Sequence, residues 1–283
     1  MNLNFQLIDP LIQSALDEDI QSGDITTEAT IPPDVPALGR FLIKQHGVLA
    51  GNEIVRRVFQ LVDPALEYAI ALHDGTGVEP GQVVATVSGS AASILRGERT
   101  ALNFMQRMSG IATATKSYLD LVKPYPVKIM DTRKTVPGLR ALDKYAVTVG
   151  GGSNHRIGLY DMFLIKDNHI QVAGSVTNAI ERCKLYRKEK GIDSRIEVEV
   201  TNFDELDEAL HCGVDRIMLD NFSVEDLRKA VAVIAGRSEI EASGGITSET
   251  IHAVAATGVD IISVGALTHS VKGLDISLEV SIS

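Results

Sequence analysis

The chain has 283 residues, of which 45% are hydrophobic and 23% charged, and its formal net charge is −10. This is the composition of a globular protein with a sizeable core, and its acidity argues against a nucleic-acid-binding protein, which needs a basic surface. We see no secretory signal and no apolar run near the ~20 residues that span a bilayer, and the two cysteines lack metal or disulfide spacing, so we expect a cytoplasmic protein.

The first 110 residues read as an α+β module. "RFLIKQHGVLAG" (40–51) and "GQVVATVSGS" (81–90) have the composition of strands, and the turn-rich "DGTGVEPGQ" (74–82) lies between them. "AASILRGERTALNFMQRMSG" (91–110) follows with apolar residues at helical spacing. We therefore expect an N-terminal α/β sandwich domain over 1–110, joined by the C-terminal tail 270–283.

From about residue 127, short apolar runs alternate with helix-like stretches. The runs are rich in Val, Ile and Leu, as in strands that are covered on both faces: 127–131, 162–166, 196–200, 216–220, 239–243 and 261–265. An amphipathic helix is predicted over "NFDELDEALHCG" (202–213), with Gly213 as the residue that ends it.

The strand ends recur at a steady interval. Glu199, Asp220, Ser243 and Gly265 follow one another at spacings of 21, 23 and 22 residues. Such a period predicts right-handed parallel βα units. Only six units fit into this half, whereas a full eight-fold barrel needs ~250 residues. The sequence therefore predicts a short or incomplete six-stranded α/β barrel over residues 111–269.

The predicted strand ends carry an unusual local charge. Between residues 131 and 169 the chain has six Lys or Arg against four Asp, with His155 and His169 in addition, although the rest of the chain is strongly acidic. Active sites of such barrels lie at the carboxyl ends of the strands. We therefore predict a cationic pocket for multivalent anions.

Two kinds of anion contact are expected there. "SGGITSET" (243–250) places glycines between a strand and a helix, with Thr247 as the expected N-cap, and "VGAL" (264–267) completes a phosphate site. Side chains such as Arg133 and Arg156 supply the other contacts. The bare "GGG" (150–152) in front of His155 would let the chain turn tightly.

The carboxylates of Glu199 and Asp220 have two natural uses in a phosphate site. They can hold Mg²⁺, or they can stabilise a cationic transition state. Glycine-rich turns and strand-end carboxylates can also have a purely structural role, such as capping the next helix. Lys166 could instead serve as the Schiff-base lysine of an aldolase. Spacing alone thus predicts an enzyme for a phosphorylated substrate and leaves its reaction open.

Longer motifs resemble a known family. "ERTALNFMQRMSGIAT" (98–113), "DTRKTVPGLRALDKYAVTVGGGSNHRIGLYDMFLIKDNHI" (131–170), "EVEVTN", "IMLDNF", "EASGGI" and "ISVGALTHS" closely resemble quinolinate phosphoribosyltransferases. The resemblance runs from about residue 17 to the C-terminus. It implies transfer of the phosphoribosyl group of phosphoribosyl pyrophosphate to quinolinate, giving nicotinate mononucleotide, pyrophosphate and CO₂ in NAD biosynthesis.

The resemblance also implies partners and roles. It implies Mg²⁺ as cofactor, with Glu199 and Asp220 as metal ligands, and a homodimer in which Arg99 reaches the neighbouring active site; assembly beyond a dimer stays open. Lys134, Lys166, Glu199 and Asp220 are the implied catalytic residues. The implied substrate-binding residues are Arg99, Thr132, Arg133, Lys134, His155, Arg156, Lys166, Glu199, Asp220, Ser243, Gly244, Gly245, Val264, Gly265 and Ala266.

Three alternatives remain beside this hypothesis. The first is a paralogue of the molybdenum-transport-associated type that acts on another substrate. The second is an inactive barrel with a binding or regulatory role. The third is the Schiff-base aldolase on Lys166.

Overall fold

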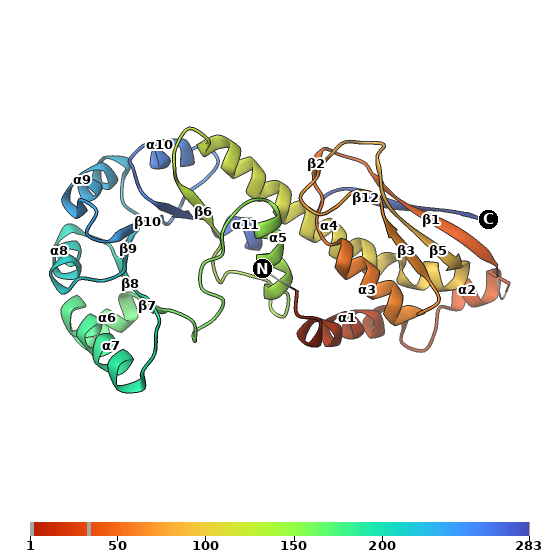
Figure 1. Cartoon of the computed structure of the whole chain (residues 1–283), viewed down its shortest axis with the longest axis horizontal. Coiled ribbons are helices and arrows are strands. Elements are labelled where there is room, and N and C mark those ends of the chain that lie inside the picture. Colours follow the sequence, from red (N-terminus) through yellow and green to blue (C-terminus); the bar gives the residue numbers. More distant parts are fainter. Residues whose placement is uncertain (1–2, 33–34, 283) are drawn as a thin grey trace. The chain divides into compact units, whose positions relative to one another are not determined.

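The computed structural model describes residues 3–32 and 35–282, which form two compact units. The first unit contains residues up to 116, 135–151 and 267 onward, and the second contains 117–134 and 152–266. Each unit is built around its own sheet (Figure 1). Helix α4 (Ala91–Val122) begins in the first unit and ends in the second. The domain boundary predicted after residue 110 falls inside this helix and stays a prediction.

The first unit is built on an antiparallel sheet in the order β12-β1-β5-β3. Burial alternates along β1, as expected for a sheet with one covered face. Phe41 of that strand packs edge-on against Phe59 and Tyr68, with ring centroids 6.1 and 5.9 Å away. The strands are β1 (Pro36–Ile43), β3 (Glu67–Ile70), β5 (Val83–Ser90) and β12 (Ile276–Ile282), with the small pair β2 (Gly47–Val48) and β4 (Gly77–Val78).

The helices of this unit include α5 (Arg140–Val149), which comes from the separate segment 135–151. They are α1 (Phe5–Ile20), α2 (Ile25–Thr30), α3 (Asn52–Val62), most of α4, α5 and nearly all of α11 (Ala266–His269). Buried Asp143 of α5 accepts two hydrogen bonds from Arg107 of α4, at 2.9 and 2.8 Å. Tyr145 of α5 donates to Asp74 at 3.0 Å. These bonds explain why residues 135–151 pack with the first unit.

The second unit is a parallel sheet of six strands in the order β6-β11-β10-β9-β8-β7. The helices lie along the outer side of its strands (Figure 1). Among the described residues, edge strands β6 and β7 do not pair with each other, so the barrel is open. The elements are β6 (Lys128–Met130), β7 (Phe163–Ile165), α6 (Asp167–Ala173), α7 (Val176–Lys190), β8 (Ile196–Val200), α8 (Phe203–Cys212), β9 (Arg216–Asp220), α9 (Val224–Ile234), β10 (Glu239–Ser243), α10 (Ile251–Ala255) and β11 (Ile261–Ser263).

The predicted fold class is confirmed. All six predicted strands of the incomplete barrel are present, and an α+β module precedes them. The helix predicted over 202–213 is α8, which ends at Gly213 as expected. Within the described part of the chain, no helix combines the length and the apolar character that crossing a membrane requires.

The glycine run owes its composition to packing as well as to turning. A Cβ on Gly150 would lie 2.4 Å from the backbone oxygen of Ala112 in α4, and Gly151 has a φ of +92°. The first glycine therefore permits close contact with α4, and the second takes a backbone conformation that other residues avoid.

Gly150→Ala should lower the free energy of unfolding by about 1–3 kcal/mol, because the added methyl group overpacks the contact with α4. Gly77→Ala is the matched control, since a Cβ there meets nothing within 4 Å. Urea denaturation measures both variants. Equal midpoints for the two would contradict the packing role of Gly150.

Candidate active site

The parallel register brings six strand ends to one edge of the second unit. Ser243 pairs with Asp220, and Ser263 pairs with Met130. Residues 131–134, Lys166, Glu199, Asp220, 243–245 and 264–266 therefore follow or end strands at the same edge. This is the edge at which α/β barrels place their active sites.

A cavity of about 160 Å³ opens among these strand ends. Several predicted site residues line it: Thr132, Arg133, Lys134, His155, Arg156, Lys166 and Ser243. Leu164, Met218, Glu241 and Ser263 complete the lining. Four Lys or Arg side chains thus face one carboxylate, so the cavity favours anions.

The two arginines of the cavity repel each other. Burial lowers the pKa of Arg156, and the charge of Arg133 lowers it further. The buried Nε atom of Arg133 has no hydrogen-bond partner among the described residues. A dianion between these guanidinium groups would relieve the repulsion and satisfy the unused donor.

The loop that carries His155 and Arg156 is held to the end of β6. Ser153 forms a parallel bridge with Met130, and its backbone N–H donates to the oxygen of Ile129 at 2.9 Å. The carboxylate of Asp131, which is fully buried, accepts the backbone N–H of His155 at 2.9 Å. Asp131 thereby fixes the backbone from which both side chains enter the cavity.

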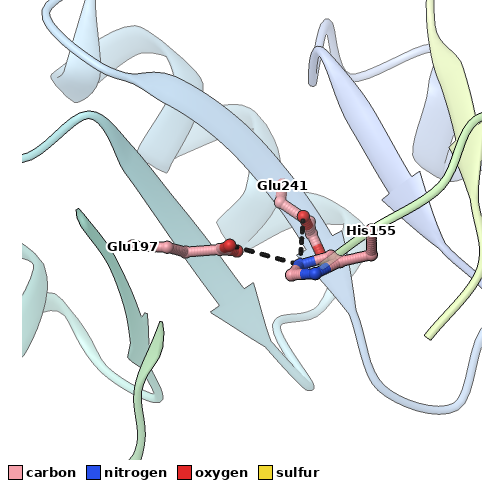
Figure 2. A group of neighbouring side chains, drawn as sticks. All are labelled: His155, Glu197 and Glu241. Carbon is pink, nitrogen blue, oxygen red and sulfur yellow. Dashed lines mark ion pairs between the residues drawn. The ribbon is translucent and has the colours of Figure 1, made fainter. Parts of the chain in front are cut away.

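The His155 ring has protein contacts at both nitrogens. Nε2 lies 3.2 Å from Glu197 Oε2 and 3.4 Å from Glu241 Oε2 (Figure 2). Nδ1 accepts the backbone N–H of Arg156 at 2.7 Å, so the ring proton lies on Nε2 in this geometry. Burial acts to lower the pKa of His155, but the two carboxylates outweigh it and raise the pKa to about 9. The Arg156 N–H opposes the second proton, which would bind at Nδ1.

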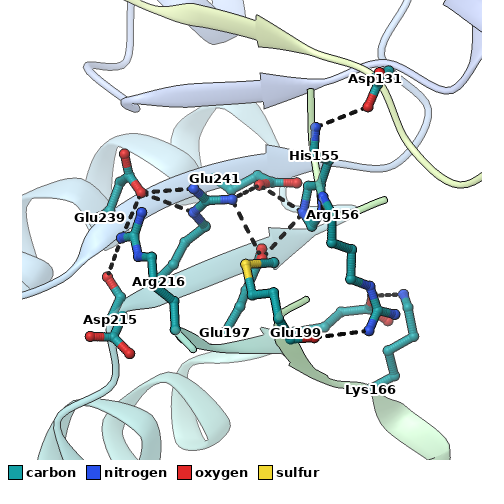
Figure 3. A network of polar contacts seen from close by, with 12 residues as sticks. Asp131, His155, Arg156, Lys166, Glu197, Glu199, Asp215, Arg216, Glu239 and Glu241 are labelled. Carbon is teal, nitrogen blue, oxygen red and sulfur yellow. Dashed lines mark hydrogen bonds and ion pairs between the residues drawn. The ribbon is translucent and has the colours of Figure 1, made fainter. Parts of the chain in front are cut away.

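Below the cavity, the interior of the barrel holds a network of charges (Figure 3). Arg216 of β9 contacts Glu239 through Nε and Nη2, at 3.0 and 2.9 Å. Its Nη1 lies 3.2 Å from Glu241 and 3.5 Å from Glu197. Because side chains two residues apart share a face of a strand, this layer lies beneath Glu199, Asp220 and Ser243.

Lys166 and Glu199 form an ion pair across neighbouring strands (Figure 3). The carboxylate is mostly buried and the ammonium group is partly exposed. The pair places Nζ of Lys166 against a carboxylate at the edge where the strands end.

The turn after β10 depends on two glycines. Gly244 has a φ of +89° and Gly245 a φ of +61°. A Cβ on Gly244 would lie 2.3 Å from Oδ1 of Asn221, whose side-chain amide donates to Asp220 at 2.8 Å. The bare backbone at Gly244 therefore lets the β9 and β10 loops approach closely.

The prediction that Thr247 caps a helix is wrong. Helix α10 begins at Ile251, with Thr250 at the N-cap position and no side-chain capping bond. Thr247 instead lies in a turn in which its oxygen accepts the N–H groups of Thr250 and Ile251, at 3.2 and 3.0 Å. This local turn delays the start of the helix.

The remaining predicted residues lie outside the cavity lining. Gly244, Gly245, Val264, Gly265 and Ala266 follow the adjacent strands β10 and β11. Glu199 and Asp220 end β8 and β9. Arg99 is an exposed residue of α4 in the first unit.

The sequence analysis missed the carboxylates beneath His155. Glu197 and Glu241 stand in the middle of strands expected to be buried on both faces. A buried carboxylate needs a partner of opposite charge. The two glutamates inside otherwise apolar strands could therefore have predicted a buried ion-pair network.

Comparison with known proteins finds similarity along most of the chain. Residues 24–109 match the N-terminal domain of quinolinate phosphoribosyl transferase, and residues 111–279 match its C-terminal domain. A Nicotiana tabacum protein named quinolinate phosphoribosyltransferase [decarboxylating] 1b is 46% identical, over 95% of this chain and 81% of its own. A probable nicotinate-nucleotide pyrophosphorylase [carboxylating] of Synechocystis is 42% identical, over 97% of this chain and 92% of its own.

A solved structure agrees with these relatives. The nicotinate-nucleotide pyrophosphorylase of Francisella tularensis superimposes with a TM-score of 0.94 and 40% identity, over 99% of this chain and 98% of that one. An open α/β barrel with cations at its carboxyl edge defines an enzyme for anionic substrates. The chain belongs to the quinolinate phosphoribosyltransferase family, which confirms the resemblance seen in the sequence.

The aromatic dicarboxylate phthalate at constant ionic strength should raise the melting temperature by about 2–4 °C, because a dianion that binds only the folded protein stabilises it. Arg133→Met should remove most of this shift. Arg182→Met is the control, since Arg182 lies outside the cavity lining. Differential scanning fluorimetry measures the shifts, and an undiminished shift in Arg133→Met would contradict anion binding in the cavity.

Proposed function

We propose that this protein transfers the phosphoribosyl group of phosphoribosyl pyrophosphate to quinolinate and releases pyrophosphate and CO₂, with nicotinate mononucleotide as product. The cavity's cations carry the proposal, because both reactants are multiply charged anions and would otherwise repel each other. The names of the relatives favour this reaction.

Quinolinate is proposed to bind at the arginine end of the cavity. Arg133 and Arg156 would each hold a carboxylate with forked hydrogen bonds, and Lys134 would add a further charged contact. The His155 ring, whose nitrogens face the protein, would contact the substrate through its carbon atoms, and Thr132 would hold the turn that carries Lys134. Thr132 Oγ1 accepts the backbone N–H of Lys134 at 3.0 Å. The apolar side chains of Leu164 and Met218 in the lining suit the faces of a pyridine ring.

Phosphoribosyl pyrophosphate is proposed to bind along the strand ends of β7 to β11. Residues 243–245 and 264–266 would hold the 5′-phosphate through backbone N–H groups, and Lys134 and Lys166 would contact the pyrophosphate. The oxygens of Glu199 and Asp220, on neighbouring strands, fit Mg²⁺, which prefers hard ligands shared with phosphates. When bound, the ion would neutralise charge on the pyrophosphate.

The side chains would act by holding charge in place. As the bond from the anomeric carbon to pyrophosphate breaks, the ribose gains positive charge, which Glu199 and Asp220 would stabilise. The ring nitrogen of quinolinate then forms the new bond to that carbon. The resulting pyridinium takes up the electron pair when the 2-carboxylate leaves as CO₂, and a proton replaces it at C2.

Arg156→Ala should lower kcat/KM for quinolinate at least 100-fold, because it removes a forked, charge-assisted contact to a carboxylate. Arg228→Ala, on the exposed side of α9, should stay within twofold of the unchanged protein. The assay follows ¹⁴CO₂ released from carboxyl-labelled quinolinate with phosphoribosyl pyrophosphate and Mg²⁺. Near-normal turnover by Arg156→Ala would remove the proposed role.

We also propose a cytoplasmic homodimer in which Arg99 completes the partner's site. Arg99→Ala and Lys134→Ala should each be inactive alone. After subunit exchange, a mixture should regain activity, up to about a quarter of the wild-type level, since a hybrid dimer holds one intact site. The ¹⁴CO₂ assay and native mass spectrometry measure activity and exchange; verified hybrids without activity would contradict the shared site.

A further inference from the structure

The proposed chemistry leaves two buried carboxylates unused. Glu197 and Glu241 are both fully buried, on β8 and β10. A buried carboxylate costs several kcal/mol unless a cation or hydrogen bonds compensate it. Their retention under the cavity therefore needs partners of opposite charge.

Arg216 supplies only part of this compensation. Its Nε and Nη2 atoms contact Glu239, and only Nη1 contacts Glu197 and Glu241. Both oxygens of Glu197 and Oε1 of Glu241 lack hydrogen bonds among the described residues. The Ser263 hydroxyl also faces Glu241, and Nε2 of His155 is the polar group that lies near both carboxylates, at 3.2 and 3.4 Å (Figure 2).

The three side chains also have the composition and spacing of a metal site, with ligand atoms within 4.8 Å of one another. Arg216 argues against that use, because a nitrogen of its guanidinium group already lies within 3.5 Å of both carboxylates. A divalent cation would be repelled at this distance. We therefore describe these residues as a network of ion pairs, in which the His155 ring lies on the side of the cavity and Arg216 on the opposite side.

We infer that Glu197 and Glu241 are positioning residues for His155: they hold Nε2–H at the base of the cavity and so fix the ring before a substrate binds. The inference rests on the proposed function, in which His155 contacts quinolinate. Asp131 holds the backbone N–H of the same residue, so the backbone and Nε2 of His155 each lie against a carboxylate.

The charges around the ring agree with this role. Burial acts to raise the pKa of Glu241, but His155, the Ser263 hydroxyl and Arg216 together outweigh it and lower the pKa, so the geometry favours an ionised carboxylate beside Nε2. Glu197 faces the same nitrogen from β8, and its pKa is raised, by burial first and then by the charge of Glu241. The backbone N–H of Arg156 donates to Nδ1. The ring thus has carboxylates at one nitrogen and a backbone donor at the other.

Glu241→Gln and Glu197→Gln test the inference, because each keeps the shape of the side chain and replaces the carboxyl group by an amide. Each should raise KM for quinolinate about tenfold and leave KM for phosphoribosyl pyrophosphate within twofold. Glu239→Gln is the matched control, since Glu239 contacts Arg216 and has no contact with His155. It should leave both KM values within twofold.

A double-mutant cycle separates positioning from a structural role. If Glu241 acts through His155, then His155→Gln/Glu241→Gln should lose no more quinolinate affinity than His155→Gln alone. If the double variant instead loses quinolinate affinity by the product of the two single losses, the inference is overturned. So would an effect of Glu239→Gln equal to that of Glu241→Gln, because it would assign the loss to Arg216.

Nitrogen-15 NMR of labelled histidine gives a readout that does not need turnover. The His155 signal, assigned by its absence in His155→Gln, should show a proton held on Nε2, and the Nε2 shift should change in Glu241→Gln. An unchanged ring signal in a folded Glu241→Gln protein would refute the inference even if activity falls. If His155→Gln itself keeps normal quinolinate kinetics, the proposed role of His155 fails instead.

Discussion

The structure depends on one electrostatic constraint: like charges are held together at the mouth of a barrel. Four Lys or Arg side chains line one small cavity, and the charge of Arg133 lowers the pKa of Arg156. The parallel register keeps their strand ends at one edge in spite of this repulsion. A bound anion would relieve this repulsion.

The inner face of the barrel is arranged in layers that serve different purposes. Glu199, Asp220 and Ser243 end their strands near the cavity, and residues two positions earlier are Glu197, Met218 and Glu241. Arg216 and Glu239 lie one further step below, at the beginnings of β9 and β10. Alternation along each strand thus stacks the layer of strand-end residues upon a layer of buried ion pairs, and His155 lies between the two.

Local sequence patterns sufficed to predict the barrel and the Lys and Arg side chains of its cavity. Short apolar runs with a steady βα period determine parallel strands, and the carboxyl ends of such strands must meet. Contacts between distant segments could not be predicted in this way. The packing of α5 with the first unit depends on Arg107 and Asp74, and the beginning of α10 depends on a turn in which Thr247 competes with helix formation.

The central claim is that the cavity selects its pyridine substrate by the number of negative charges. Isothermal titration calorimetry with quinolinate and with nicotinate tests it most directly, since the two differ by one carboxylate. The account predicts that quinolinate binds at least 100-fold more tightly, about 2.7 kcal/mol, with a preference that weakens as salt is added. Equal affinity for the two pyridines would contradict it.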